Sequence, residues 1–174
     1  DTVSDPITLT KLLESVPVSF RSPSWSPSGD KLVFVVSQNG TGSVLYTIDT
    51  DGTGLDDLEI TGYMPVWLDN GRIMYSAWGD AGSALWTCAS DGTDLQKVWE
   101  TPEEGWITHP DVVPRTGGGY RVAYSHQYYY EGVGGDADLY TLELDSNMAV
   151  VMEPTRIVGA EGPDNSFDYA PSFN

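Results

Sequence analysis

A short pattern that recurs along the chain constrains its fold more than any other feature. The stretch "PSWSPSGDKLVFVVS" begins at Pro23, and "PVWLDNGRIMYSA" begins at Pro65 with the same Pro-x-Trp start. A third unit starts at Pro110, and a further proline start stands at Pro171. Each of the first three starts leads into a glycine-containing turn and then a short run of β-formers, which is typical of a strand. The chain therefore contains a repeat with a period of roughly 42 to 45 residues.

A second signature, Leu-Tyr/Trp-Thr, recurs in phase with the first. It begins at Leu45, Leu85 and Leu139. In the first two units an Asp-Gly turn follows, at Asp51 and at Asp91, and Asp-Gly supplies the positive φ that a tight hairpin requires. A further strand-like run closes each unit. Four short antiparallel strands per repeat, joined by Gly and Asp turns, are typical of a β-propeller blade.

The prediction is therefore an all-β chain of about three propeller blades, with almost no helix. The strands predicted most directly are 31–37, 43–49, 72–78, 83–89, 121–128 and 138–144. The expected units are an outer strand of a preceding blade with a linker (1–21), blade one (22–62), blade two (63–107), blade three with longer loops (108–162) and the start of a further blade (163–174).

Three blades fall short of the four to eight that close a propeller. Either the chain is a segment of a larger ring, or several chains together close one. The strands expected near 7–13 and 169–173 lack blades of their own, so their backbone groups need partners. We therefore expect a protein partner, or further copies of the chain, to bind through these terminal strands.

The units resemble the TolB-type repeat, a WD-repeat-like propeller family. Its form is Pro-Ser-Trp/Phe-Ser-Pro-Asp-Gly, an apolar strand, a polar link, Leu/Ile-Tyr-x-x-Asp and Asp-Gly. The resemblance covers about residues 22–162 and is partial in the third unit, where "HPDVVPRTGGG" lacks the aromatic residue and has a longer turn. The family includes periplasmic scaffold proteins, propeller domains of serine peptidases and cell-surface binding modules. The resemblance therefore implies the fold without fixing the function.

Aromatic residues at repeated positions are expected to pack between neighbouring blades and stabilise the fold. Trp25, Trp67, Trp86, Tyr46 and Tyr140 are predicted to be largely buried between sheets. On this interpretation, replacing Trp86 with alanine destabilises the chain strongly.

Composition excludes several functions. The chain has 26 acidic and 8 basic residues and a formal charge of −18, so it repels nucleic-acid phosphates and anionic lipid. Nucleic-acid binding is therefore not expected. No apolar run approaches the roughly 20 residues of a membrane span, so membrane insertion is not expected either. The single cysteine, Cys88, lies in an apolar run and is interpreted as a buried small hydrophobe. These features permit an extracytoplasmic location, whether periplasmic, secreted or at the cell surface.

Motifs that carry chemistry are sparse. The sequence contains no G-x-S-x-G elbow, P-loop, C-x-x-C pair or H-E-x-x-H motif, so we expect a chain that is not an enzyme. His109, just before Pro110, matches Met64 and Ala170 at positions that face a propeller channel. It is either part of a metal or catalytic site in the channel or a hydrogen-bonded polar residue.

The link after the second strand of unit three is long and aromatic. Its Tyr128, Tyr129 and Tyr130 are candidates to stack on a sugar or to bind a protein, unless they face inward between blades. Asp136 and Asp138, two residues apart in a glycine-rich link, are the first candidates for a Ca²⁺ site. No other cofactor is indicated.

Three classes of function stay open. The preferred one is a non-catalytic extracytoplasmic propeller scaffold that mediates protein–protein interaction or self-assembly. The second is the propeller domain of a larger serine hydrolase or peptidase, whose chemistry lies on another domain. The third is a carbohydrate-binding or lyase propeller.

Overall fold

The computed structural model describes residues 18–38, 42–80, 82–102, 105–128 and 137–158. These residues form three four-stranded antiparallel sheets, and no helix occurs among them. The first sheet contains β1 (Val18–Trp25), β2 (Lys31–Gln38), β3 (Gly42–Asp49) and β4 (Asp56–Thr61). The second contains β5 (Tyr63–Trp67), β6 (Ile73–Trp78), β7 (Ser83–Cys88) and β8 (Gln96–Glu100). The third contains β9 (Trp106–Pro114), β10 (Tyr120–Gln127), β11 (Ala137–Leu144) and β12 (Val150–Val158).

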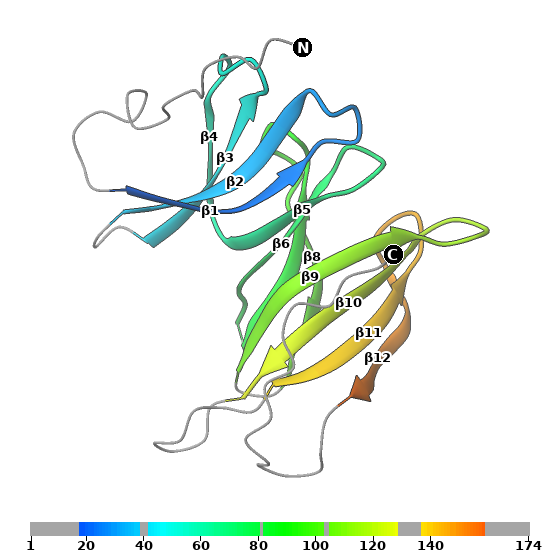
Figure 1. The fold of residues 1–174 in the computed structure, drawn as a ribbon. Coiled ribbons are helices and arrows are strands. Elements are labelled where there is room, and N and C mark those ends of the chain that lie inside the picture. The colour runs from blue at the N-terminus through cyan, green and yellow to red at the C-terminus, as the bar shows by residue number, and fades with distance from the viewer. Residues whose placement is uncertain (1–17, 39–41, 81, 103–104, 129–136, 159–174) are drawn as a thin grey trace.

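Each sheet is a simple meander in which neighbouring strands follow one another in the sequence. The three sheets succeed one another from the blue sheet to the orange one, and β5 contacts both β1 and β9 (Figure 1). The first strands of the sheets are therefore neighbours, as they are around the axis of a propeller. The all-β propeller prediction is confirmed, and each of the six predicted strands agrees with the observed one to within one residue at either end.

The first strand of every sheet carries the same backbone irregularity. Ser22, Met64 and His109 have φ angles of 50°, 50° and 49°, and each directly precedes a proline. A residue before proline is ordinarily extended, and a positive φ is uncommon outside glycine. The strand register shifts beside each of these residues, which is the mark of a β-bulge that turns the rest of the strand. Three equivalent bulges therefore aim the ends of β1, β5 and β9 in a common way.

Two hydrophobic clusters join the sheets. Between the first and second sheets lie Val33, Val35, Leu45, Leu58, Ile60, Ile73, Tyr75 and Cys88. Between the second and third lie Leu68, Met74, Leu85, Val98, Ile107, Tyr120, Val122, Tyr124, Leu142, Leu144 and Met148. The repeated leucine of the Leu-Tyr/Trp-Thr signature is fully buried at Leu45 and Leu85, which explains why the sequence repeats it.

The expected burial of five aromatic rings holds only in part. Tyr46 is buried, whereas Trp67, Trp86 and Tyr140 are half-buried against the core clusters. Trp25 is 61% exposed, so the prediction that its ring lies between sheets is wrong. The ring stands at the end of β1, in a hollow that it shares with residues of the second and third sheets.

Cys88 has the buried environment that the sequence predicted. Its side chain is fully inaccessible within the cluster between the first and second sheets, and burial raises the pKa of its thiol to about 11. Because the thiolate is the reactive form, we expect negligible reaction of the folded chain with a thiol reagent at pH 8 and rapid reaction in urea. Ser90→Cys, which places a thiol on a nearby exposed turn, provides the fast-reacting control. Rapid labelling of Cys88 in the folded chain would contradict the packing described.

The terminal strands predicted near residues 7–13 and 169–173 lie outside the described residues, so binding through them stays a prediction. Within the part of the chain that the structure describes, no helix has the length and hydropathy required to cross a membrane.

Candidate functional site

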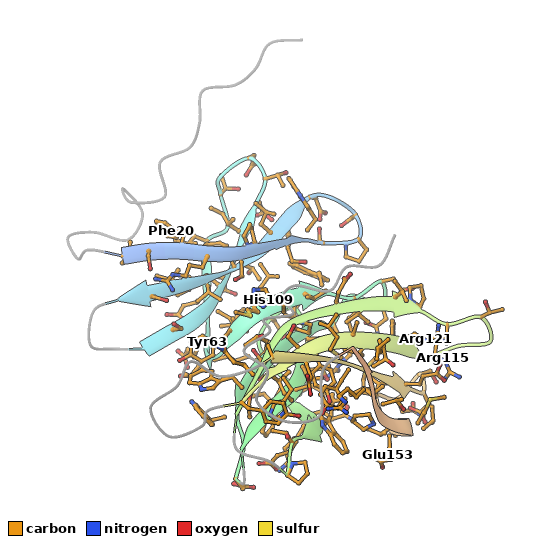
Figure 2. All side chains as sticks on the ribbon, turned by 60° about the horizontal axis from the view of Figure 1, so that its bottom comes forward. Phe20, Tyr63, His109, Arg115, Arg121 and Glu153 are labelled. Carbon is orange, nitrogen blue, oxygen red and sulfur yellow. The ribbon has the colours of Figure 1, made fainter. Side chains whose placement is uncertain are left out.

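The two ends of the sheets carry different side chains. Phe20 and Tyr63 lie toward one end, where β1 and β5 begin, and Arg115 lies toward the opposite end, just after β9 (Figure 2). The first strands meet at both ends: the backbone N–H of Trp67 donates to Ser24 Oγ at 3.0 Å where β1 and β5 end, and the ring centroids of Tyr63 and Trp106 are 5.8 Å apart where β5 and β9 begin. β5 therefore lies between β1 and β9, and residues near the last positions of all three strands line one surface.

A hollow at this surface is built from equivalent residues of the three repeats. Trp25, Trp67 and Val112 each stand two residues after the proline that follows a bulge, and all three line one hollow of about 210 Å³. The rest of its lining is Pro27, Leu68, Asp69, Pro114 and Tyr120. Its walls are therefore mostly apolar, with a single carboxylate among them.

Two larger hollows, each of about 420 Å³, adjoin the first. One extends over the turn between β1 and β2, and the other over the turn between β9 and β10. All three hollows share Asp69. We call the combined depression the strand-end groove; it comprises turns 26–31, 68–71 and 114–120 together with Trp25, Trp67 and Val112.

Each turn that lines the strand-end groove is closed by a backbone hydrogen bond of its own. The backbone N–H of Ser26 donates to Lys31 O at 2.9 Å, that of Leu68 to Arg72 O at 2.8 Å, and that of Arg115 to Gly119 O at 2.9 Å. Each turn is thus closed by its own backbone on a rigid strand pair. Loops held in this way commonly carry recognition.

Asp69 is held in place by the third repeat. The Tyr120 hydroxyl donates to Asp69 Oδ1 at 2.6 Å, across the boundary between the second and third sheets. Burial, together with this bond, raises the pKa of Tyr120 to about 12, so the phenol stays a donor at physiological pH. The Asp69 carboxylate is therefore oriented while its residue remains exposed to solvent.

The acidic and basic side chains of the groove have different kinds of partner. Asp30 accepts hydrogen bonds from Ser28 and Ser26, at 2.5 and 2.9 Å, and these bonds lower the pKa of its carboxyl group. The Lys31 ammonium pairs with Asp49, and the Arg115 guanidinium pairs with Glu143 at 2.7 Å.

Among the described residues, no lysine, arginine or histidine forms an ion pair with Asp30 or Asp69. The cations of the groove walls are therefore neutralised by other carboxylates, whereas the side-chain partners of these two carboxylates are hydroxyl groups. The lining carries two carboxylates, Asp30 and Asp69, and two cations, Lys31 and Arg115, and only the cations form ion pairs among the described residues.

His109 lies on β9, at the centre of the view in Figure 2, and does not line the groove. Its backbone N–H lies 3.0 Å from Met64 Sδ, so two of the three positions predicted to face the channel are in contact. Burial lowers the pKa of His109, which favours a neutral imidazole at pH 7. A ligand role for His109 stays a prediction.

The structure places Tyr128 against its own sheet. Its hydroxyl lies 2.6 Å from that of Tyr140, and its ring meets His126 edge-on at 4.3 Å. Tyr128 is thus half-buried by packing within the third repeat. Tyr129 and Tyr130 lie outside the described residues, so a recognition role for this link is untested.

The proposed calcium ligands are only partly described. Asp138 is 6% exposed, and its Oδ2 lies 3.3 Å from Arg156 Nη1. Asp136 lies outside the described residues, so the pair stays a prediction. Within the described ranges, no group of three or more His, Cys, Asp or Glu side chains is arranged to hold a metal ion.

Sequence reasoning misses the strand-end groove, although one signal points to it. The Pro-x-Trp start correctly predicts a repeat, but burial of its aromatic residue is the wrong interpretation for Trp25. Repeated residues at strand ends are equally able to assemble a surface that no single repeat contains.

Comparison with known proteins identifies the fold but does not identify the function. No protein-family model matches the chain, and no curated protein matches it in sequence. Among solved structures, a TolB from Agrobacterium tumefaciens has a TM-score of 0.58 at 17% identity, over 82% of this chain and 50% of that one. Acylaminoacyl peptidase from Pyrococcus horikoshii has a TM-score of 0.55 at 11% identity, over 86% of this chain and 26% of that one. An oligogalacturonate lyase in complex with manganese has a TM-score of 0.51 at 16% identity, over 81% and 42%.

These similarities support a TolB-type propeller fold and leave membership of the repeat family unshown. The chain spans about half the length of the TolB and less of the two enzymes. The prediction from absent motifs that the chain is not an enzyme is wrong, because proteins with the same fold include a lyase and a peptidase.

Proposed function

We propose that this chain is part of a β-propeller that binds an extended segment of a protein partner in its strand-end groove. The observation that carries the proposal is the run of three hollows that meet at Asp69 across three successive repeats. A single small-molecule pocket is usually concave and encloses most of its ligand. A depression that crosses three blades suits an extended chain better, because such a chain places successive residues in successive hollows.

The composition of the groove supports a protein ligand. Exposed tryptophan is rare on surfaces and common at the anchors of protein interfaces. Trp25, which lines the 210 Å³ hollow, is 61% exposed, and Pro27 and Pro114 add rigid apolar walls. These groups bury apolar area on binding at little cost in side-chain entropy.

The test is selection of random displayed peptides on the intact chain. We expect clones whose affinity falls at least about tenfold on Trp25→Ala, as for an interface anchor. Trp78→Ala is the matched control, because Trp78 is also exposed, at 53%, but stands at the end of β6 away from the groove. Clones that bind both variants equally, or that respond only to Trp78→Ala, would place the binding surface elsewhere and refute the proposal.

A second candidate function is the propeller domain of a larger hydrolase. It is favoured by the likeness to the acylaminoacyl peptidase, of which this chain matches 26%. A G-x-S-x-G motif in an adjoining coding sequence would support it.

The location and assembly predicted from the sequence belong to the same proposal. An extracytoplasmic location is supported by the acidic balance, by the single buried cysteine and by the TolB-type fold. Self-assembly through terminal strands would complete a ring whose described part contains three blades.

A further inference from the structure

We infer that the partner segment is basic, with arginine side chains that reach Asp69 and Asp30 and apolar residues between them. The inference rests on the proposed function and adds the chemistry of the ligand. Its starting point is that the side chains donating to these two carboxylates in the described chain are hydroxyl groups.

Hydroxyl groups orient the carboxylates of Asp30 and Asp69, and neither carboxylate forms an ion pair with a described residue. Asp69 Oδ1 is fixed by the Tyr120 hydroxyl, which leaves the rest of an exposed carboxylate to face the groove. Asp30 is fixed in the same manner by two serine hydroxyls, which keep it ionised. An arginine guanidinium can bind a carboxylate through two parallel hydrogen bonds, so it suits groups that are already oriented.

The aromatic walls favour the same ligand. Trp25 and Trp67 line the hollow that also holds Asp69. A guanidinium stacks on an indole face and is drawn to its negative quadrupole, while the aliphatic stem of the arginine covers apolar surface. One hollow is thus lined by both indole side chains and a carboxylate. A neutral peptide would contact the apolar and aromatic walls but would gain no ion pair with Asp69.

Because the whole chain is acidic, a test must distinguish binding in the groove from binding elsewhere on the surface. With a formal charge of −18, the chain attracts any cationic peptide weakly and at many places. Specific binding in the groove must therefore depend on individual groove residues. Substitution of Asp69 tests this dependence. Substitution of Asp80 is the control, because the Asp80 side chain is 99% exposed in the link between β6 and β7, outside the groove.

The experiment measures the fluorescence anisotropy of a labelled short peptide of alternating arginine and proline titrated with the intact chain. We expect Asp69→Asn, and separately Asp30→Asn, to weaken binding about tenfold or more, as for the loss of a charged hydrogen bond. Asp80→Asn should leave the affinity unchanged within about twofold, because a single exposed charge contributes little. A matched peptide of alternating glutamine and proline should bind the unaltered chain at least about tenfold more weakly.

The outcomes separate this inference from the proposed function. Equal binding of the arginine and glutamine peptides, both lost on Trp25→Ala, would overturn the basic ligand and leave the protein-binding groove standing. Arginine-peptide binding that is equally insensitive to Asp69→Asn, Asp80→Asn and Trp25→Ala would assign it to the general acidic surface and overturn the inference. Absence of any groove-dependent clone in the peptide selection would refute the proposed function itself.

Discussion

Leu85→Ala should lower the free energy of unfolding by about 2 to 5 kcal/mol, the range seen when a fully buried leucine is truncated. Leu85 is completely inaccessible and belongs to the cluster that joins the second and third sheets. Its removal leaves a cavity between two sheets whose strands pack tightly, so little relaxation is available. Urea denaturation followed by tryptophan fluorescence measures the change.

Leu95→Ala is the matched control for this cavity. Leu95 is 55% exposed on the turn before β8, so the same chemical change removes little buried surface there. We expect a change within about 0.5 kcal/mol, as for most surface substitutions. Comparable losses for the two variants would show that the sheets do not pack through Leu85.

Gly119→Ala should be the most damaging change within the turns of the groove. Gly119 has a φ of +81°, and an added Cβ would stand 2.1 Å from the carbonyl oxygen of Leu144. A left-handed backbone costs an L-residue about 1 to 2 kcal/mol, and the crowding adds about 1 to 3 kcal/mol. Because Gly119 closes the turn that leads to Tyr120, the Asp69–Tyr120 hydrogen bond should weaken as well.

Gly117→Ala separates the two costs. Gly117 lies in the same turn with a φ of +99°, but no neighbouring atom lies within 4 Å of the position that an added Cβ would take. This variant should therefore show only the backbone cost of about 1 to 2 kcal/mol. Equal losses of unfolding free energy for Gly117→Ala and Gly119→Ala would contradict the close approach of Leu144.

The fold is readable from the sequence because its information is local and repeated. Alternating apolar runs, Asp-Gly turns and the Leu-Tyr/Trp-Thr signature each determine a strand or a hairpin within one unit. The leucine of that signature recurs because it fills the space between sheets at Leu45 and Leu85. The Pro-x-Trp start misleads for Trp25, because the bulge at Ser22 precedes a strand end that opens to solvent.

The candidate site is less predictable because it is made by residues that are distant in the sequence. Trp25, Asp69 and Tyr120 come from three repeats and meet only once the sheets are stacked. Tyr128 and Asp138 lie in a polar link of the sequence, but Tyr128 packs against Tyr140 and His126, and Asp138 pairs with Arg156. Pairing between neighbouring strands of one sheet decides those contacts, and composition alone does not reveal it.

The most direct test of a ligand-binding strand-end groove is to follow the indole N–H signals of the six tryptophans by ¹H–¹⁵N NMR during a titration with the arginine–proline peptide. We predict that the signals of Trp25 and Trp67, which line the groove, shift progressively and saturate. The signals of Trp78 and Trp106, whose rings meet edge-on 4.6 Å apart, should stay in place. Saturable shifts at Trp78 and Trp106 with none at Trp25 and Trp67 would contradict a binding site in the groove.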